Sequence, residues 1–159
     1  MRRAVEQNNP KSPLHRGRDS EIDQGILPGL LGYQLRRAQV HMFQHFTANL
    51  GQFGVTPGQL GLLILLSRNP GISQTALARA SGIERSTLGE VVGALEKRGL
   101  VERRRMEQDR RSHAVRLSPL GEETLAAILP LVDAHEQAAA SRLTHEERST
   151  LLGLLQRMS

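Results

Sequence analysis

Residues 73–105 read SQTALARASGIERSTLGEVVGALEKRGLVERRR, and this stretch decides the fold. Ser73 is a typical N-cap for a short helix, and Ser81-Gly82 forms a turn before a second amphipathic helix over residues 84–98. Two short helices joined by a tight turn that contains glycine form a helix-turn-helix. The positions expected to face the core are Ala76, Leu77, Ala80, Leu88, Val91, Val92 and Leu95.

A β-hairpin is predicted directly after the second helix. Residues 100–105 (LVERRR) are interpreted as one strand, and residues 114–117 (AVRL) alternate in the manner of a half-buried strand. The charged stretch EQDRRSH, residues 107–113, would form the tip between them. A helix-turn-helix followed by a hairpin is a winged helix. We therefore expect a mainly α-helical fold with a small β-hairpin wing.

Further amphipathic helices are predicted on both sides of this unit. Apolar residues recur at helical spacing over residues 26–50 and again over 119–158. These helices carry more apolar surface than one small domain covers, and a symmetric homodimer would bury it through an isologous interface. The alternative is that they fold back on their own domain. We expect a disordered basic tail over 1–20 and one domain over 21–159, with the winged helix-turn-helix at 56–118 between dimerisation helices.

Charge and composition narrow the class of protein. The chain has 159 residues, a formal net charge of +5 and no cysteine, which excludes disulfides, zinc–thiolate sites and thiol-based redox sensing. Eight basic and four acidic residues fall within 96–116, which favours a polyanionic partner. The charged N-terminus lacks the apolar core of a signal peptide, and no apolar run is long enough for a bilayer, so we expect a cytoplasmic protein without a membrane partner. No catalytic constellation is found, and an enzyme is not expected.

Residues 76–123, ALARASGIERSTLGEVVGALEKRGLVERRRMEQDRRSHAVRLSPLGEE, resemble the MarR family of bacterial transcriptional regulators. The shared features are the leucine-alanine helix, the Ser-Thr pair that opens the next helix, LEKRGLVER, an Asp-x-Arg wing tip and VRLSPLG. The resemblance extends over residues of about 26 to 158. It implies a dimeric winged-helix protein that binds a pseudo-palindromic double-stranded DNA operator and releases it when a small molecule binds.

The second helix of a DNA-binding helix-turn-helix enters the major groove with its N-terminal residues. In that position Arg85, Ser86 and Thr87 could reach base edges and phosphates. The alternative for Ser86 and Thr87 is that their hydroxyls cap the helix. Glu90 would either accept a hydrogen bond from a cytosine amino group or pair with Arg85 or Arg98. The expected phosphate contacts of the first helix are Ser73, Gln74 and Arg79. Gly89 and Gly93 cost helix stability, which indicates close approach to DNA or to a neighbouring helix.

The hairpin tip is predicted to probe the minor groove. Arg111 would insert there, because narrow A·T-rich segments concentrate negative potential. The Asp-x-Arg pattern of the family implies that Asp109 aims Arg111, while Arg110, on the other side of the hairpin, would meet backbone phosphates. The alternative is a solvated loop with an exposed salt bridge.

A polar stripe in the first long helix is the candidate effector site. Tyr33, Arg37, His41 and His45 are spaced four residues apart with Arg36 beside them, and these groups suit an aromatic or acyl anion. Residues 27–39, LPGLLGYQLRRAQ, also resemble the CouR-type regulators of hydroxycinnamate degradation. That resemblance implies a coenzyme A thioester as effector, with Arg36 and Arg37 at its phosphates. A solvent-facing stripe would have the same pattern.

Two other functions remain open from the sequence. A non-specific architectural DNA-binding protein would show the same basic wing. A metal-responsive regulator would use His41 and His45, whose spacing places two imidazoles on one helix face, but zinc needs further ligands. No resident cofactor is expected; the predicted small molecule is an effector, with an aromatic acyl-CoA as one candidate.

Overall fold

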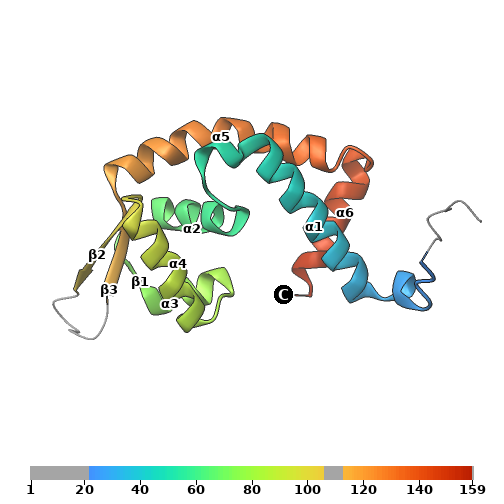
Figure 1. The fold of residues 1–159 in the computed structure, drawn as a ribbon, viewed down its shortest axis with the longest axis horizontal. Helices are drawn as coiled ribbons and strands as arrows, with labels where there is room; N and C mark the ends of the chain where they lie inside the picture. Colours follow the sequence, from blue (N-terminus) through green and yellow to red (C-terminus); the bar gives the residue numbers. More distant parts are fainter. Residues whose placement is uncertain (1–21, 106–112, 159) are drawn as a thin grey trace, which may run out of the picture.

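The computed structural model describes residues 22–105 and 113–158 (Figure 1). The predicted helix-turn-helix is present as α3, Gln74–Ser81, and α4, Arg85–Lys97. The Ser73 hydroxyl accepts a hydrogen bond from the backbone N–H of Ala76 at 3.2 Å, as expected of an N-cap. Gly82 ends α3 with φ +65°, a left-handed conformation that favours glycine, and so turns the chain into α4.

The predicted core face of α3 was wrong at one position. Leu77 is buried as expected, but Ala80 is exposed and Ala78 is buried instead. The reason is that α3 packs against both α2 and α4, so its buried arc is centred on residues 77 and 78. In α4 the predicted positions Leu88, Val92 and Leu95 are buried and Val91 is half-buried.

The wing is a three-stranded antiparallel sheet in the order β1-β3-β2. The expected hairpin consists of β2, Val101–Arg105, and β3, His113–Leu117, with Arg103 opposite Val115. The sequence did not predict β1, Ile72–Ser73, which pairs with β3 and ties the start of α3 to the wing. A strand of two residues is too short to show alternation. The tip residues between β2 and β3 lie outside the described residues.

Helices on either side of the winged helix complete the fold. The element η1, Leu27–Gly29, is a short 3-10 turn, followed by α1, Leu31–Leu50, and η2, Gly51–Phe53. Next come α2, Pro57–Arg68, and, after the sheet, α5, Pro119–Ala139, and α6, His145–Gln156. Capping boxes open α2 at Thr56 and α6 at Thr144. In Figure 1, α1 and α5 cross above the winged helix, and α6 lies at the end of the molecule away from the sheet.

The hydrophobic core lies between α2, α3, α4, the sheet and the adjoining parts of α1 and α5. Side chains without exposed surface include Leu63, Leu77, Leu88, Leu95, Val115 and Ile128. Within the described part of the chain, no single helix meets both the length and the hydropathy needed to cross a membrane. The segments Leu31–Phe53 and Pro57–Arg68, which are bent relative to each other, meet the length and hydropathy criteria only when taken together. Four leucines of the second segment are buried in this core.

Candidate nucleic-acid interface and effector pocket

The first turn of α4 presents a polar, accessible surface. Arg85, Ser86 and Thr87 are all exposed. The cap residue Glu84 makes no side-chain hydrogen bond to the helix, and the hydroxyls of Ser86 and Thr87 make none to other described residues. Free backbone N–H groups at a helix start, next to an arginine, form a site for a phosphate or another anion. This end of α4 can therefore contact a polyanion.

Glu90 and Arg98 do not pair with each other. Arg98 donates hydrogen bonds to the backbone oxygens of Gly54 at 2.6 Å and Phe53 at 3.3 Å, at the turn that follows α1. Glu90 is exposed and has no ion-pair partner in the part of the chain that the structure describes. Its carboxylate is thus available for a contact outside the chain.

The three predicted phosphate contacts of α3 differ in accessibility. Arg79 is exposed, whereas Ser73 and Gln74 are half-buried and the Ser73 hydroxyl already caps α3. The Nε2 atom of Gln74 is buried and has no hydrogen-bond partner within residues 22–105 and 113–158. Of the three, Arg79 is the side chain that can reach a phosphate without a local rearrangement.

The described part of the wing is basic along both strands. Arg104 is exposed on β2, and Arg116 of β3 forms an ion pair across the strands with Glu102, with Nη2 and Oε2 2.7 Å apart. Asp109, Arg110 and Arg111 lie outside the described residues, so their roles remain predictions from the sequence. In Figure 1 the sheet, α3 and α4 lie together at one end of the molecule.

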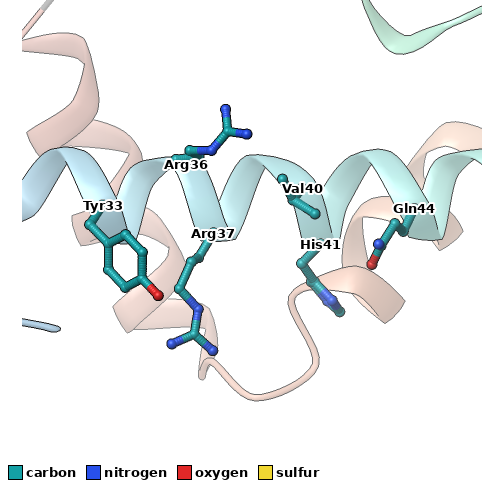
Figure 2. Close-up of a pocket in the computed structure, with 6 residues that line it drawn as sticks. All are labelled: Tyr33, Arg36, Arg37, Val40, His41 and Gln44. Atoms are coloured by element: carbon teal, nitrogen blue, oxygen red, sulfur yellow. The ribbon is translucent and has the colours of Figure 1, made fainter. Parts of the chain in front are cut away.

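The polar stripe of α1 lines a hollow of about 210 Å³ (Figure 2). Its lining consists of Tyr33, Arg36, Arg37, Val40, His41 and Gln44. Figure 2 shows Tyr33, Arg37 and His41 on the same side of α1, whereas the guanidinium of Arg36 points away from that of Arg37. The Arg37 guanidinium carbon lies 5.8 Å from the centroid of the Tyr33 ring, in the range of a cation–π contact. Four of the five predicted effector residues therefore meet at one hollow.

His45, the fifth, is directed elsewhere. Its Nδ1 lies 2.8 Å from Nδ1 of His135 in α5, and Asn49 lies beside it. His135 is only 6% exposed, and its ring packs edge-on against Phe46. Burial lowers the pKa of His135; Glu136 raises this pKa and His45 lowers it further. Sequence reasoning missed His135, because nothing in the pattern of α5 indicates which residue of another helix it meets.

The spacing of His41 and His45 predicts two imidazoles on one face, and their ring centroids are 6.4 Å apart. They nevertheless have different partners, since His41 Nε2 lies 3.1 Å from the backbone oxygen of Ala139. Within residues 22–105 and 113–158, no group of three or more His, Asp or Glu side chains is arranged to hold a metal ion. The metal-responsive alternative thus gains no further ligand from the described residues.

Comparisons with known proteins agree on one kind of protein. The model of the MarR family matches residues 55–113. The chain is 39% identical over 150 residues to a putative transcriptional regulatory protein for the hcr operon of Thauera aromatica, covering 91% of this chain and 90% of the relative. Among solved structures, the transcriptional repressor CouR bound to a 23-mer DNA duplex has a TM-score of 0.79 and 40% identity, covering 87% and 99% of the two chains. CouR bound to p-coumaroyl-CoA has a TM-score of 0.79 and 38% identity, covering 87% and 97%.

Proposed function

This chain belongs to the MarR family of DNA-binding transcriptional regulators, and from that premise we propose that it is a ligand-responsive dimeric repressor. It is released from a pseudo-palindromic operator by a small aromatic acid or its acyl-CoA thioester, such as p-coumaroyl-CoA. The observation that carries the proposal is the similarity to CouR, solved both with a DNA duplex and with p-coumaroyl-CoA, over most of both chains.

In this proposal α4 is the recognition helix. Its first turn, with Arg85, Ser86 and Thr87 exposed, enters the major groove, and Glu90 faces a cytosine amino group one turn further on. The wing tip adds Arg111 in the minor groove, aimed by Asp109, and Arg110 at the phosphates. Arg79 supports the docking from α3, with Ser73 and Gln74 nearby.

The homodimer is supported by apolar surface that the single chain leaves uncovered. Outside the winged helix, exposed large apolar side chains gather on the segment before α1, on α1, α5 and α6, and in the turn between α5 and α6. They include Ile22, Ile26, Leu27, Leu30, Leu31, Phe43, Leu131, Leu143, Leu151, Leu152, Leu154 and Met158. An exposed apolar area spread over several helices is typical of an interface, and a two-fold axis would cover both copies at once.

The chemistry of the hollow on α1 supports an anionic aromatic effector. Tyr33 offers a ring face and a hydroxyl, and Arg37 stands over that ring. The two guanidinium groups of Arg36 and Arg37 point in different directions, which suits a ligand with separated anionic groups. Coenzyme A carries a diphosphate and a 3′-phosphate, so its thioesters meet this requirement better than a free aromatic acid does.

The test begins with selection of DNA sites by the purified protein from a random library. Fluorescence anisotropy on the selected duplex then measures release by p-coumaroyl-CoA and feruloyl-CoA, with the free acids and coenzyme A as controls. Release by the thioesters supports the acyl-CoA effector, and release by the free acids alone identifies an aromatic acid. Release by none of these compounds contradicts the effector class.

The same titration separates a regulator from an architectural DNA-binding protein. A regulator binds its selected site on the order of 10³-fold or more tightly than random DNA of the same length. Equal affinity for both duplexes would favour the architectural alternative and contradict the operator-binding proposal.

A further inference from the structure

Gly93 of α4 lies against Arg103 of strand β2. A Cβ atom added at Gly93 would stand 3.0 Å from Nη2 of Arg103, a distance that only a shift of the guanidinium would relieve. The same Nη2 donates a hydrogen bond to the backbone oxygen of Gly89 at 3.4 Å. A Cβ at Gly89 would meet no other atom of the described residues, so Gly89 contributes its carbonyl oxygen. The glycine at position 93 thus makes room for an arginine from the wing.

Glu96 completes the contact. Its Oε2 lies 3.0 Å from Nε of Arg103, which makes the two groups an ion pair, although the buried Nε has no hydrogen-bond partner of acceptable angle among the described residues. The side chains of Glu96 and Arg103 are 43% and 25% exposed. Gly89, Gly93 and Glu96 are spaced four and three residues apart, which places them along one face of α4. We call these three residues and Arg103 the α4–β2 clamp. It joins α4 to β2, the strand that follows this helix after a tight turn.

Stability alone is a weak reason for this arrangement. A glycine inside a helix costs about 0.8–1 kcal/mol relative to alanine. A partly exposed ion pair returns about 0–1 kcal/mol. The clamp therefore offers little net stabilisation, but it restricts the orientation of α4 relative to the wing, because the guanidinium lies against Gly93, donates to Gly89 and is paired in charge with Glu96.

We propose that Arg103 is a positioning residue for DNA binding, seated on α4 by Gly89, Gly93 and Glu96. The proposal rests on the proposed function, in which α4 and the wing contact adjacent grooves. Two contacts made by one rigid unit reinforce each other only when their separation and angle match the duplex. Arg103 acts through that angle, and its guanidinium faces α4 rather than DNA.

Glu96→Gln gives the sharpest test, because a role of charge alone and a role in the clamp predict opposite changes in operator affinity. Removal of a negative charge near bound DNA raises affinity if only charge matters. The clamp predicts a loss of operator affinity, on the order of three- to tenfold, which corresponds to about 0.7–1.4 kcal/mol. Glu123→Gln, which removes an exposed charge on α5, is the control for charge alone. Equal or higher affinity of Glu96→Gln than of Glu123→Gln overturns the proposal.

Arg103→Ala and Arg104→Ala separate positioning from a direct phosphate contact. Both remove one positive charge from β2, but Arg104 is exposed and lies outside the clamp. A lost phosphate contact flattens the dependence of log affinity on log salt by about 0.9. We expect Arg103→Ala to weaken operator binding on the order of tenfold or more with an unchanged salt slope. A flattened slope for Arg103→Ala would overturn positioning in favour of phosphate contact.

Gly93→Ala tests the clamp independently if the Arg103→Ala variant does not fold. Alanine favours the helix, so we expect an equal or higher melting temperature together with weaker operator binding. The double variant Arg103→Ala/Glu96→Gln should bind no more weakly than Arg103→Ala alone, since both changes break one contact. Additive losses, or unchanged affinity of Gly93→Ala, would overturn the clamp. If the wild-type protein selects no DNA site, the proposed function itself fails, which is a different result.

Discussion

The Nδ1 atoms of His45 and His135 face each other at 2.8 Å between α1 and α5. At this distance one of the two atoms carries the hydrogen and the other accepts it, so the two imidazoles do not both present an N–H to the contact. Glu136 stands on the far side of His135, its Oε1 3.9 Å from Nε2, and Arg148 of α6 lies 3.5 Å from the Glu136 carboxylate. A chain of polar contacts therefore runs from His45 of α1 through His135 and Glu136 of α5 to Arg148 of α6.

We predict that the protein loses stability as the pH falls below the usual histidine pKa. Burial lowers the pKa of His135 in the folded state, so between about pH 6.5 and its folded pKa the unfolded chain binds a proton that the folded chain does not. Above this pH range both states leave His135 neutral, so its titration does not change the free energy of unfolding. Thermal melts at pH 8 and pH 5.5 should show a smaller drop for His135→Gln than for the wild type.

His145→Gln is the matched control, since His145 is an exposed histidine at the start of α6. It should show the same drop as the wild type. If His135→Gln and the wild type lose equal stability on acidification, protonation of His135 does not account for that loss.

Gly121→Ala should destabilise the fold strongly. Gly121 is buried in the first turn of α5, and a Cβ there would collide with the backbone oxygen of Leu100, which cannot move aside as a side chain can. We expect a loss of more than about 2 kcal/mol in the free energy of unfolding, measured by urea denaturation. Gly61→Ala in α2, where a Cβ would meet no described residue outside its own helix, should instead gain about 0.5–1 kcal/mol. Equal effects of the two changes would contradict the packing described for Gly121.

Arg111→Ala should weaken operator binding strongly while leaving the dimer folded. The predicted minor-groove contact places its charge in concentrated negative potential, and its loss should cost about 1–3 kcal/mol of binding free energy. Anisotropy titrations at several salt concentrations measure both affinity and slope. Arg157→Ala, which removes a charge at the end of α6, is a suitable control. Unchanged affinity and slope for Arg111→Ala would sink the wing assignment.

Arg37→Gln should reduce the response to the effector more than binding to DNA. Arg37 lines the hollow on α1 beside Tyr33 and lies on the long helix outside the winged helix. Loss of one charge-assisted contact should raise the acyl-CoA concentration needed for release by about tenfold, from about 1.5 kcal/mol. Gln39→Ala, an exposed change on the same helix, is the control. If Arg37→Gln releases DNA at wild-type concentrations of p-coumaroyl-CoA, the hollow is not its site.

The sequence by itself determined the features that depend on neighbours along the chain. The capping boxes at Thr56 and Thr144, the cap at Ser73 and the turn at Gly82 all involve contacts between residues three or four apart. These contacts, like the helical and strand periods of the apolar residues, lie among neighbouring residues, so the winged helix-turn-helix and the hairpin strands were predicted correctly. The spacing of four also places Tyr33, Arg37 and His41 on one side of α1 (Figure 2), while their role in effector binding stays a prediction.

Only the tertiary structure decided which faces and side chains meet across the chain. Periodicity defines a helix but leaves its rotation to the neighbours that cover it, which is why Ala78 rather than Ala80 is buried in α3. His45 leaves the effector stripe because α5 brings His135 to it from 90 residues away. Gly93 makes room for Arg103 because β2 folds back along α4. Each of these contacts joins different elements, and no local pattern specifies the partner.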